Sequence, residues 1–267
     1  MRLNIIFYST TKDYQIMKER MLVLAKAAPI VSSKYEHLIC VAGITENGEW
    51  RRIYPIPFKL FLTGHGFKKK SWIEYELENP EPSNHRPESR KIIPESVKQL
   101  EEEDYGKIHE LLQSRVTSLE ELQSKSHREV SLGVIKPKIM DFYAGENKHL
   151  AKMIKKCGQR NIFGKSVVRI DTTEKEFSYV FECCDNCNKK HDILVEDWEV
   201  AELYRNCKKY WKMGKYPSES VVIMKVREKM FEWMKNRKEV FFIVGTHFKF
   251  NTYIIIGIVY PRKNDKF

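Results

Sequence analysis

The residues best suited to chemistry in this chain are four cysteines and a histidine between positions 183 and 207. In the segment FECCDNCNKKHDI, Cys184 and Cys187 form a C-x-x-C pair, and His191 follows after three more residues. Sulfur and imidazole at this spacing can bind one tetrahedral Zn²⁺. We expect Cys207, on the next predicted helix, as the fourth ligand, with Cys183 as the competing one. Four protein ligands leave no open position for water, so the pattern predicts a structural zinc site. The alternative is a run of reduced cysteines at a strand end beside a solvent-exposed histidine.

A second candidate is the segment LICVAGITENGEWRRIYPIPF, residues 38–58. Asn47-Gly48 between two apolar runs predicts a β-hairpin with a type I′ turn. Alternation along the return strand places Trp50, Arg52 and Tyr54 on one face and Arg51 on the other. Guanidinium groups that meet phosphates, and rings that stack on bases, would make this hairpin a nucleic-acid surface. The alternative is a surface hairpin with two solvated arginines.

Two further sets extend the predicted nucleic-acid surface. Lys68, Lys69 and Lys70 follow a glycine-containing loop, and His247, Phe248 and Lys249 form a polar-aromatic hairpin tip near the carboxyl end. Residues 147–165 carry six basic and no acidic side chains, which predicts either a phosphate-binding arm or a solvated connector.

Catalytic signatures are mostly missing from the sequence. It has no H-E-x-x-H, G-x-S-x-G or dinucleotide-binding glycine motif. Asp141 with Glu146 and Lys148 imitates the acidic-plus-lysine set of metal-dependent nucleases, but the spacing is short for such a site. We therefore expect a protein that is not an enzyme.

The charge of the chain points to a polyanionic partner. The net charge is +11 over 267 residues, with a hydrophobic content of 42% that is typical of a folded protein. Residues 201–267 alone carry 15 basic and 6 acidic side chains, and this concentration favours binding to DNA or RNA. Since there is no apolar run of 18 residues and the cysteines have metal-site spacing, we expect a cytoplasmic protein.

The expected elements place these candidates in an α+β fold. Short strands and turns up to residue 77 predict a small β-barrel, and residues 79–94 read as a linker. The pattern predicts a helix over 94–115, a returning strand over 129–142, and helices over 196–211 and 218–235. Two apolar strands, 240–245 and 252–260, close the chain.

Several segments together resemble a known family. LAKAAPIVSSKYEHLICVAGITENGEWRRIYPIPF, SLGVIKPKIMDF, DWEVAELYRNC and FFIVGTHFKFNTYIIIGIVYPRK resemble the dual OB-fold domain family of bacterial and archaeal genome-defence and conflict loci. The resemblance implies two oligonucleotide-binding (OB) barrels, the second interrupted by a zinc knuckle and helices. It also implies a protein that reads DNA or RNA.

We therefore expect an extension over 1–20, a first OB-like barrel over 21–94, and a helical segment with a returning strand over 95–145. A basic connector over 146–165 and a second OB-like barrel over 166–267 follow. The expected function is nucleic-acid binding in a defence setting. The alternatives are a metal-dependent nuclease and a protein–protein adaptor in a defence complex.

Overall fold

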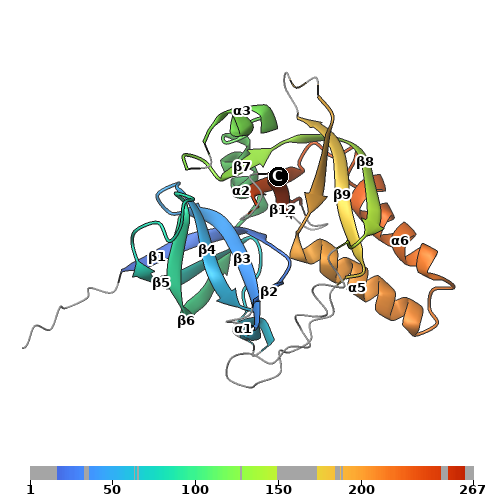
Figure 1. Ribbon diagram of the computed structural model, residues 1–267, viewed down its shortest axis with the longest axis horizontal. Helices are drawn as coiled ribbons and strands as arrows, with labels where there is room; N and C mark the ends of the chain where they lie inside the picture. Colours follow the sequence, from blue (N-terminus) through green and yellow to red (C-terminus); the bar gives the residue numbers. More distant parts are fainter. Residues whose placement is uncertain are drawn as a thin grey trace, which may run out of the picture.

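The computed structural model describes residues 17–32, 36–62, 64, 66–126, 128–148, 173–183, 187, 189–247 and 252–261. The strands of these residues form two sheets, which lie side by side in Figure 1 with helices around them. The predicted α+β class is confirmed. Within the described ranges, no helix is both long and apolar enough to cross a membrane.

The first sheet closes into a barrel, because β1 pairs with β5 on one side and with β3 on the other. The described strands of this sheet are β1 (Lys18–Lys26), β2 (Ile30–Ser32), β3 (Glu36–Thr45), β4 (Trp50–Pro57), β5 (Ser71–Asn79) and β6 (Ser89–Glu102). The short helix α1 (Lys59–Leu62) lies between β4 and β5. The β4–β6 pair is parallel and the other pairs of this sheet are antiparallel. Inward-facing side chains such as Val23, Ile53 and Tyr75 fill the barrel and are fully buried.

The predicted hairpin is confirmed as β3 and β4, but its turn differs from the expected one. Gly48 has a φ of 79°, whereas Asn47 does not have a positive φ. The Gly48 amide donates to the Thr45 carbonyl over 2.9 Å. These features describe a type I turn followed by a left-handed glycine, which is the commonest three-residue hairpin loop. The type I′ prediction is therefore wrong.

The helix predicted over 94–115 is wrong in its first half, which belongs to strand β6. This strand pairs with β5 through three register shifts and completes the barrel, so tertiary pairing overrides local helix propensity. The helix that does form, α2 (Tyr105–Gln113), starts only after Asp104, whose side chain caps it by accepting a hydrogen bond from the Gly106 amide. The first barrel thus ends near residue 102 and not at 94.

The second sheet has the order β7-β11-β12-β10-β9-β8. Its described strands are β7 (Leu132–Ile135), β8 (Pro137–Glu146), β9 (Lys175–Cys183), β10 (His191–Val195), β11 (Phe241–Thr246) and β12 (Tyr253–Val259). Only Lys136 separates β7 from β8, so the two ends of this order are consecutive parts of the chain. Both strands belong to the second sheet, and the predicted middle segment over 95–145 is wrong in containing them.

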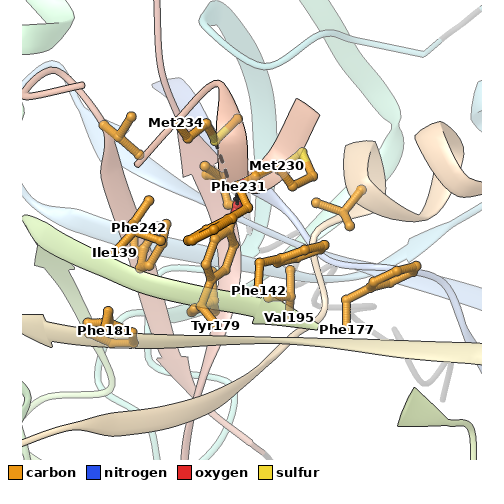
Figure 2. Packing of buried hydrophobic residues seen from close by; sticks show 14 of the residues in the cluster. Ile139, Phe142, Phe177, Tyr179, Phe181, Val195, Met230, Phe231, Met234 and Phe242 are labelled. Carbon is orange, nitrogen blue, oxygen red and sulfur yellow. Dashed lines mark hydrogen bonds between the residues drawn. The ribbon is translucent and has the colours of Figure 1, made fainter. Parts of the chain in front are cut away.

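Helices between β10 and β11 cover the core of the second sheet. They are α5 (Trp198–Lys212), α6 (Glu219–Arg227) and the π-helical turn η1 (Glu228–Glu232). They confirm the helices predicted over 196–211 and 218–235. Figure 2 shows Met230 and Met234 packed over rings from the sheet, with a dashed line between the Tyr179 hydroxyl and the Met234 sulfur. The Tyr179 hydroxyl also donates to the Met230 carbonyl. A hydrogen-bonded Tyr179 can be fully buried at little cost.

The two sheets are joined by an apolar seam. Outward-facing side chains of β1 and β3, including Leu22, Leu24 and Ile44, pack against Ile243 and Ile256 of the second sheet. Helix α2 adds Tyr105, Ile108 and Leu112 to this contact. Since these side chains are 9% exposed or less, the seam is a shared core, which holds the two halves as one body.

Candidate metal centre

Four potential ligands meet where β9 ends and β10 begins. Cys183 is the last residue of β9, His191 is the first of β10, and Cys187 lies in the connection between them. The fourth is Glu120, in the first turn of α3 (Leu119–Ser124). The ligand atoms of these four residues all lie within 4.8 Å of one another.

The local sequence explains how α3 reaches this point. The Ser118 hydroxyl caps the helix by accepting a hydrogen bond from the Glu121 amide over 3.1 Å. The Leu119 amide donates to the Cys183 sulfur over 3.4 Å, and Leu119 itself is buried in the core. With Leu119 fixed against the sheet, the next side chain, Glu120, extends toward the connection between β9 and β10, where the other three ligands lie.

The distances between the ligand atoms are close to those around a tetrahedral ion. Cys187 Sγ lies 3.3 Å from Glu120 Oε1 and 3.2 Å from His191 Nε2, and these last two atoms are 3.1 Å apart. Ligands at usual zinc distances would be about 3.4–3.8 Å apart at tetrahedral angles. The arrangement is a few tenths of an ångström tighter, so a small outward shift of the side chains would admit a zinc-sized ion.

Two further features fit a cation-binding role for this donor set. Glu120 Oε2 is buried and has no hydrogen-bond partner, although an unpaired carboxylate oxygen is costly to bury. Burial, with Cys187 and Glu120 close by, raises the pKa of Cys183 to about 12. A bound cation would relieve both conditions, since it pairs the oxygen and deprotonates a coordinated thiol.

The structure changes the predicted ligand set. Cys187 and His191 lie in the cluster, and Cys183, expected only as a competitor, lies there as well. Cys184 lies outside the described residues. Cys207 is not in the cluster: it is buried on the face of α5 that also carries Val200 and Tyr204, packed into the core. The prediction of Cys207 as a ligand is therefore wrong, because helical periodicity directs it inward.

Glu120 is the residue that the sequence did not predict. It lies 67 residues before Cys187 in the chain, and a glutamate in the first turn of a capped helix is ordinary in any helix. Only the packing of α3 against β9 reveals it.

The residues predicted to contact nucleic acid have other partners. Arg52 is 2% exposed and donates to the Ser131 carbonyl across the seam over 3.1 Å. Lys69 is 4% exposed and pairs with Asp197 of the second half over 2.7 Å. Buried side chains that join the two halves cannot form an exposed binding face, so the prediction is wrong for Arg52 and Lys69.

The other residues of the predicted hairpin surface also contact the rest of the protein. Arg51 pairs with Glu19 and Glu49, Trp50 packs against the seam, and burial raises the pKa of the half-buried Tyr54.

The remaining predicted cations and the second hairpin tip vary in exposure. Lys70 donates to the Tyr260 carbonyl over 3.3 Å. Lys68 is exposed and pairs with Glu102, and His247 is half-buried at the end of β11. Phe248 and Lys249 lie outside the described residues.

The acidic set that imitates a nuclease does not gather into one site. Asp141 pairs with Arg227 over 2.7 Å, and Glu146 pairs with Lys175. Within the described residues, the potential ligands that gather are the four at the knuckle.

Comparison with protein families agrees with the division into two halves. The profile of a domain of unknown function, DUF8758, matches residues 17–117, and that of a second one, DUF8757, matches residues 113–267. The second match covers more than half of the chain. The chain belongs to the DUF8757 family. The DUF8757 match contains the whole second sheet, α3 and all four residues of the metal cluster. A search of curated proteins found no match.

Proposed function

We propose that the chain is a non-enzymatic nucleic-acid-binding protein built from two OB-type barrels, the second clamped by a structural zinc ion. The observation that carries this proposal is the strand order. In the first barrel, β1, β3, β4, β5 and β6 form a ring with one parallel pair, β4–β6, which joins the third and fifth strands. An OB-fold is a five-stranded Greek-key barrel of this kind.

The second sheet has the same order if β7 and β8 count as one interrupted strand. That strand pairs with β9 at one end and with β11 at the other. Strand β10 then pairs parallel with β12, again joining the third strand to the fifth. Helices lie between the third and fourth strands in both halves, α1 in the first and α5 and α6 in the second. One topology repeated twice supports the dual-barrel proposal.

Charge supports a nucleic-acid partner over other ligands of OB barrels, which include oligosaccharides. The net charge of +11 and its concentration in residues 201–267 favour a polyanion. The resemblance of four segments to a defence-locus family adds a setting in which invading DNA or RNA would be the ligand.

The binding experiment uses fluorescence anisotropy with labelled 20-nucleotide single-stranded DNA, single-stranded RNA and duplex DNA at low salt. We expect saturable binding to at least one of them. Parallel incubation with Mg²⁺ or Mn²⁺ should leave the oligonucleotides intact, whereas chelator-sensitive cleavage would favour the nuclease alternative. An absence of binding to all three would refute the proposed function.

The metal experiment measures zinc in purified protein by elemental analysis. We expect one zinc per chain, held by Glu120, Cys183, Cys187 and His191. The substitution Cys187→Ser should lower zinc affinity at least about tenfold, since each ligand is part of a closed site. Cys207→Ser is the matched control and should keep the full zinc content. Loss of zinc in the control but not in Cys187→Ser would overturn this ligand set.

A further inference from the structure

The strand faces that OB barrels usually offer to nucleic acid are poorly suited to it in this protein. In the first barrel, the outward faces of β1 and β3 are covered by the second sheet along the seam. Outward side chains of β4 are engaged there too, as the Arg52–Ser131 contact shows. A ligand could reach this face only by separating the two halves.

The corresponding face of the second barrel is open but acidic. Side chains alternate between the two faces along β8, β9 and β10. One set points into the core, and its members Phe177, Tyr179 and Phe181 of β9 are buried. The outward set contains one lysine, Lys138, and four carboxylates: Asp141, Glu176, Glu182 and Asp192. Glu182 already pairs with Lys138, Asp141 pairs with Arg227 of α6, and Asp192 accepts a hydrogen bond from the Tyr143 hydroxyl. Four carboxylates against these two cations still leave the face net negative. A net negative face repels phosphates.

A basic groove lies instead along helix α5. It has a volume of about 310 Å³ and is lined by Arg205, Lys208, Lys209, Lys212, Tyr204 and Glu174, among others. The four basic side chains come from the second half of α5, on positions that recur every three or four residues and therefore share a side of the helix. The groove is of the size that takes a small ligand or part of a larger one.

Glu174 does not neutralise this groove. Its carboxylate pairs with Lys208 and accepts a hydrogen bond from the Tyr204 hydroxyl. Those contacts, together with a hydrogen bond from its own backbone amide, outweigh burial and lower the pKa of Glu174. Lys209 and Lys212 are exposed, and no carboxylate partner is found for either among the described residues. Two cations thus remain available to an external anion.

We propose that this α5 groove, and not a strand face, is the phosphate-binding site of the protein. The ligand is a phosphate group, and the proposal rests on the proposed nucleic-acid function, in which the phosphates belong to an oligonucleotide backbone. Lys209 and Lys212 contact the phosphates directly. Lys208 keeps Glu174 paired and so holds the one carboxylate among the described lining residues of the groove away from the ligand.

The test compares Lys209→Ala/Lys212→Ala with the wild type in the anisotropy assay, over a series of salt concentrations. Each phosphate contact contributes about 0.7 to the slope of log K against log salt for a single strand, so the double variant should lose about 1.4 from the slope. Its affinity should fall about tenfold or more at moderate salt. The matched control is Lys98→Ala/Lys107→Ala, two exposed lysines of the first half, which should leave both quantities unchanged. Equal thermal unfolding of the variants shows that the fold is intact.

Three outcomes decide between the proposals. A weakened, less salt-dependent Lys209→Ala/Lys212→Ala variant supports the groove. Wild-type binding that this variant retains in full overturns the groove and leaves the nucleic-acid function standing. No wild-type binding to any oligonucleotide overturns both. Competition by ATP separates two sources of phosphate: displacement of the oligonucleotide at low ATP concentration would assign the groove to free nucleotides instead of a nucleic-acid backbone.

Discussion

The ion pair between Lys69 and Asp197 is a buried polar contact between the two halves. Lys69 Nζ lies 2.7 Å from Asp197 Oδ2 and 2.9 Å from Glu199 Oε2, and donates to the Ile258 carbonyl over 3.1 Å. Asp197 Oδ2 also accepts from the Ile258 amide over 2.7 Å, and Oδ1 accepts from the Glu199 amide at the start of α5. Both members of the pair are buried. The substitution Lys69→Met removes the cation and leaves the carboxylate enclosed.

The expected loss follows from what remains around Asp197. Removing one partner of a buried pair costs about 3–5 kcal/mol, because the other charge is left without compensation. Two backbone amides still solvate Asp197, so we expect about 3 kcal/mol, at the lower end. Replacing Asp197 as well, in Lys69→Met/Asp197→Asn, removes the uncompensated charge and should recover part of the loss. The double variant should therefore be more stable than the sum of the two single changes predicts.

The assay is equilibrium unfolding in urea followed by circular dichroism, with Lys68→Met as the control. Lys68 is exposed and its pair with Glu102 is at the surface, so its loss should cost under about 1 kcal/mol. Burial opposes the charge of Lys69, but Asp197 and Glu199 outweigh it and raise the pKa of Lys69. A raised lysine pKa contributes stability that is present below the unfolded value, about 10.4, and is lost only as the pH rises through the folded value. In the wild type, the contribution of Lys69 should thus be the same at pH 6 and pH 8. In Lys69→Met, burial of Asp197 is no longer opposed by the cation and raises the pKa of Asp197 further, so the loss of stability should be no larger at pH 6 than at pH 8. If Lys69→Met and Lys68→Met were equally stable, the seam would not depend on this pair.

Three further predictions concern a buried carboxyl of the second half, the seam and the β3–β4 turn. Burial, and next the charge of Glu176, raises the pKa of Glu196 to about 7. The folded chain therefore holds a proton that the unfolded chain loses near pH 4.3, so stability should fall as the pH rises from about 4.5 to 7, by at most about 4 kcal/mol. Glu196→Gln should flatten this dependence in urea unfolding. A Cβ on Gly257 would lie 2.6 Å from the Ala25 Cβ across the seam, so Gly257→Ala should lower the free energy of unfolding by about 1–3 kcal/mol, whereas Gly145→Ala, with open space around it, should change little. Gly48→Ala should cost about 1 kcal/mol in the same assay, because alanine resists the φ of 79°.

The sequence predicted best those elements that are specified locally. Asn47-Gly48 located the β3–β4 hairpin because a glycine with positive φ was needed there, whichever turn type formed. Helix α5 was recognisable from acids at its start and lysines at its end, and Asp197 indeed caps it. The two closing apolar strands, now β11 and β12, were equally clear from their composition.

The errors arose where distant partners decide the outcome. Strand β6 carries helix-forming residues, but β5 lies beside it and needs a hydrogen-bonded neighbour to close the barrel. Arg52 and Lys69 look like surface cations, because charged residues are rarely buried without partners. Their partners, Ser131 and Asp197, lie 79 and 128 residues further along the chain, so sequence reasoning had no means to pair them.

The metal site was only partly predictable, because one of its ligands, Glu120, comes from a distant part of the chain. Cys187 and His191 are four residues apart, and their spacing alone suggested a shared ion. Glu120 comes from a helix that packs on the end of β9, and Cys207 was excluded by the register of α5. Both outcomes depend on which side of a helix faces the sheet, and neither depends on the C-x-x-C spacing.

The salt dependence of oligonucleotide binding tests the central claim most directly. The equilibrium constant of the zinc-loaded wild type for a labelled single strand is measured between 50 and 300 mM salt. We predict a straight line of log K against log salt with a slope of about −1.4 or steeper, since Lys209 and Lys212 of the α5 groove each make a phosphate contact that contributes roughly 0.7. Binding that does not respond to salt, or no binding at 50 mM, would contradict a protein that holds nucleic acid through its phosphates.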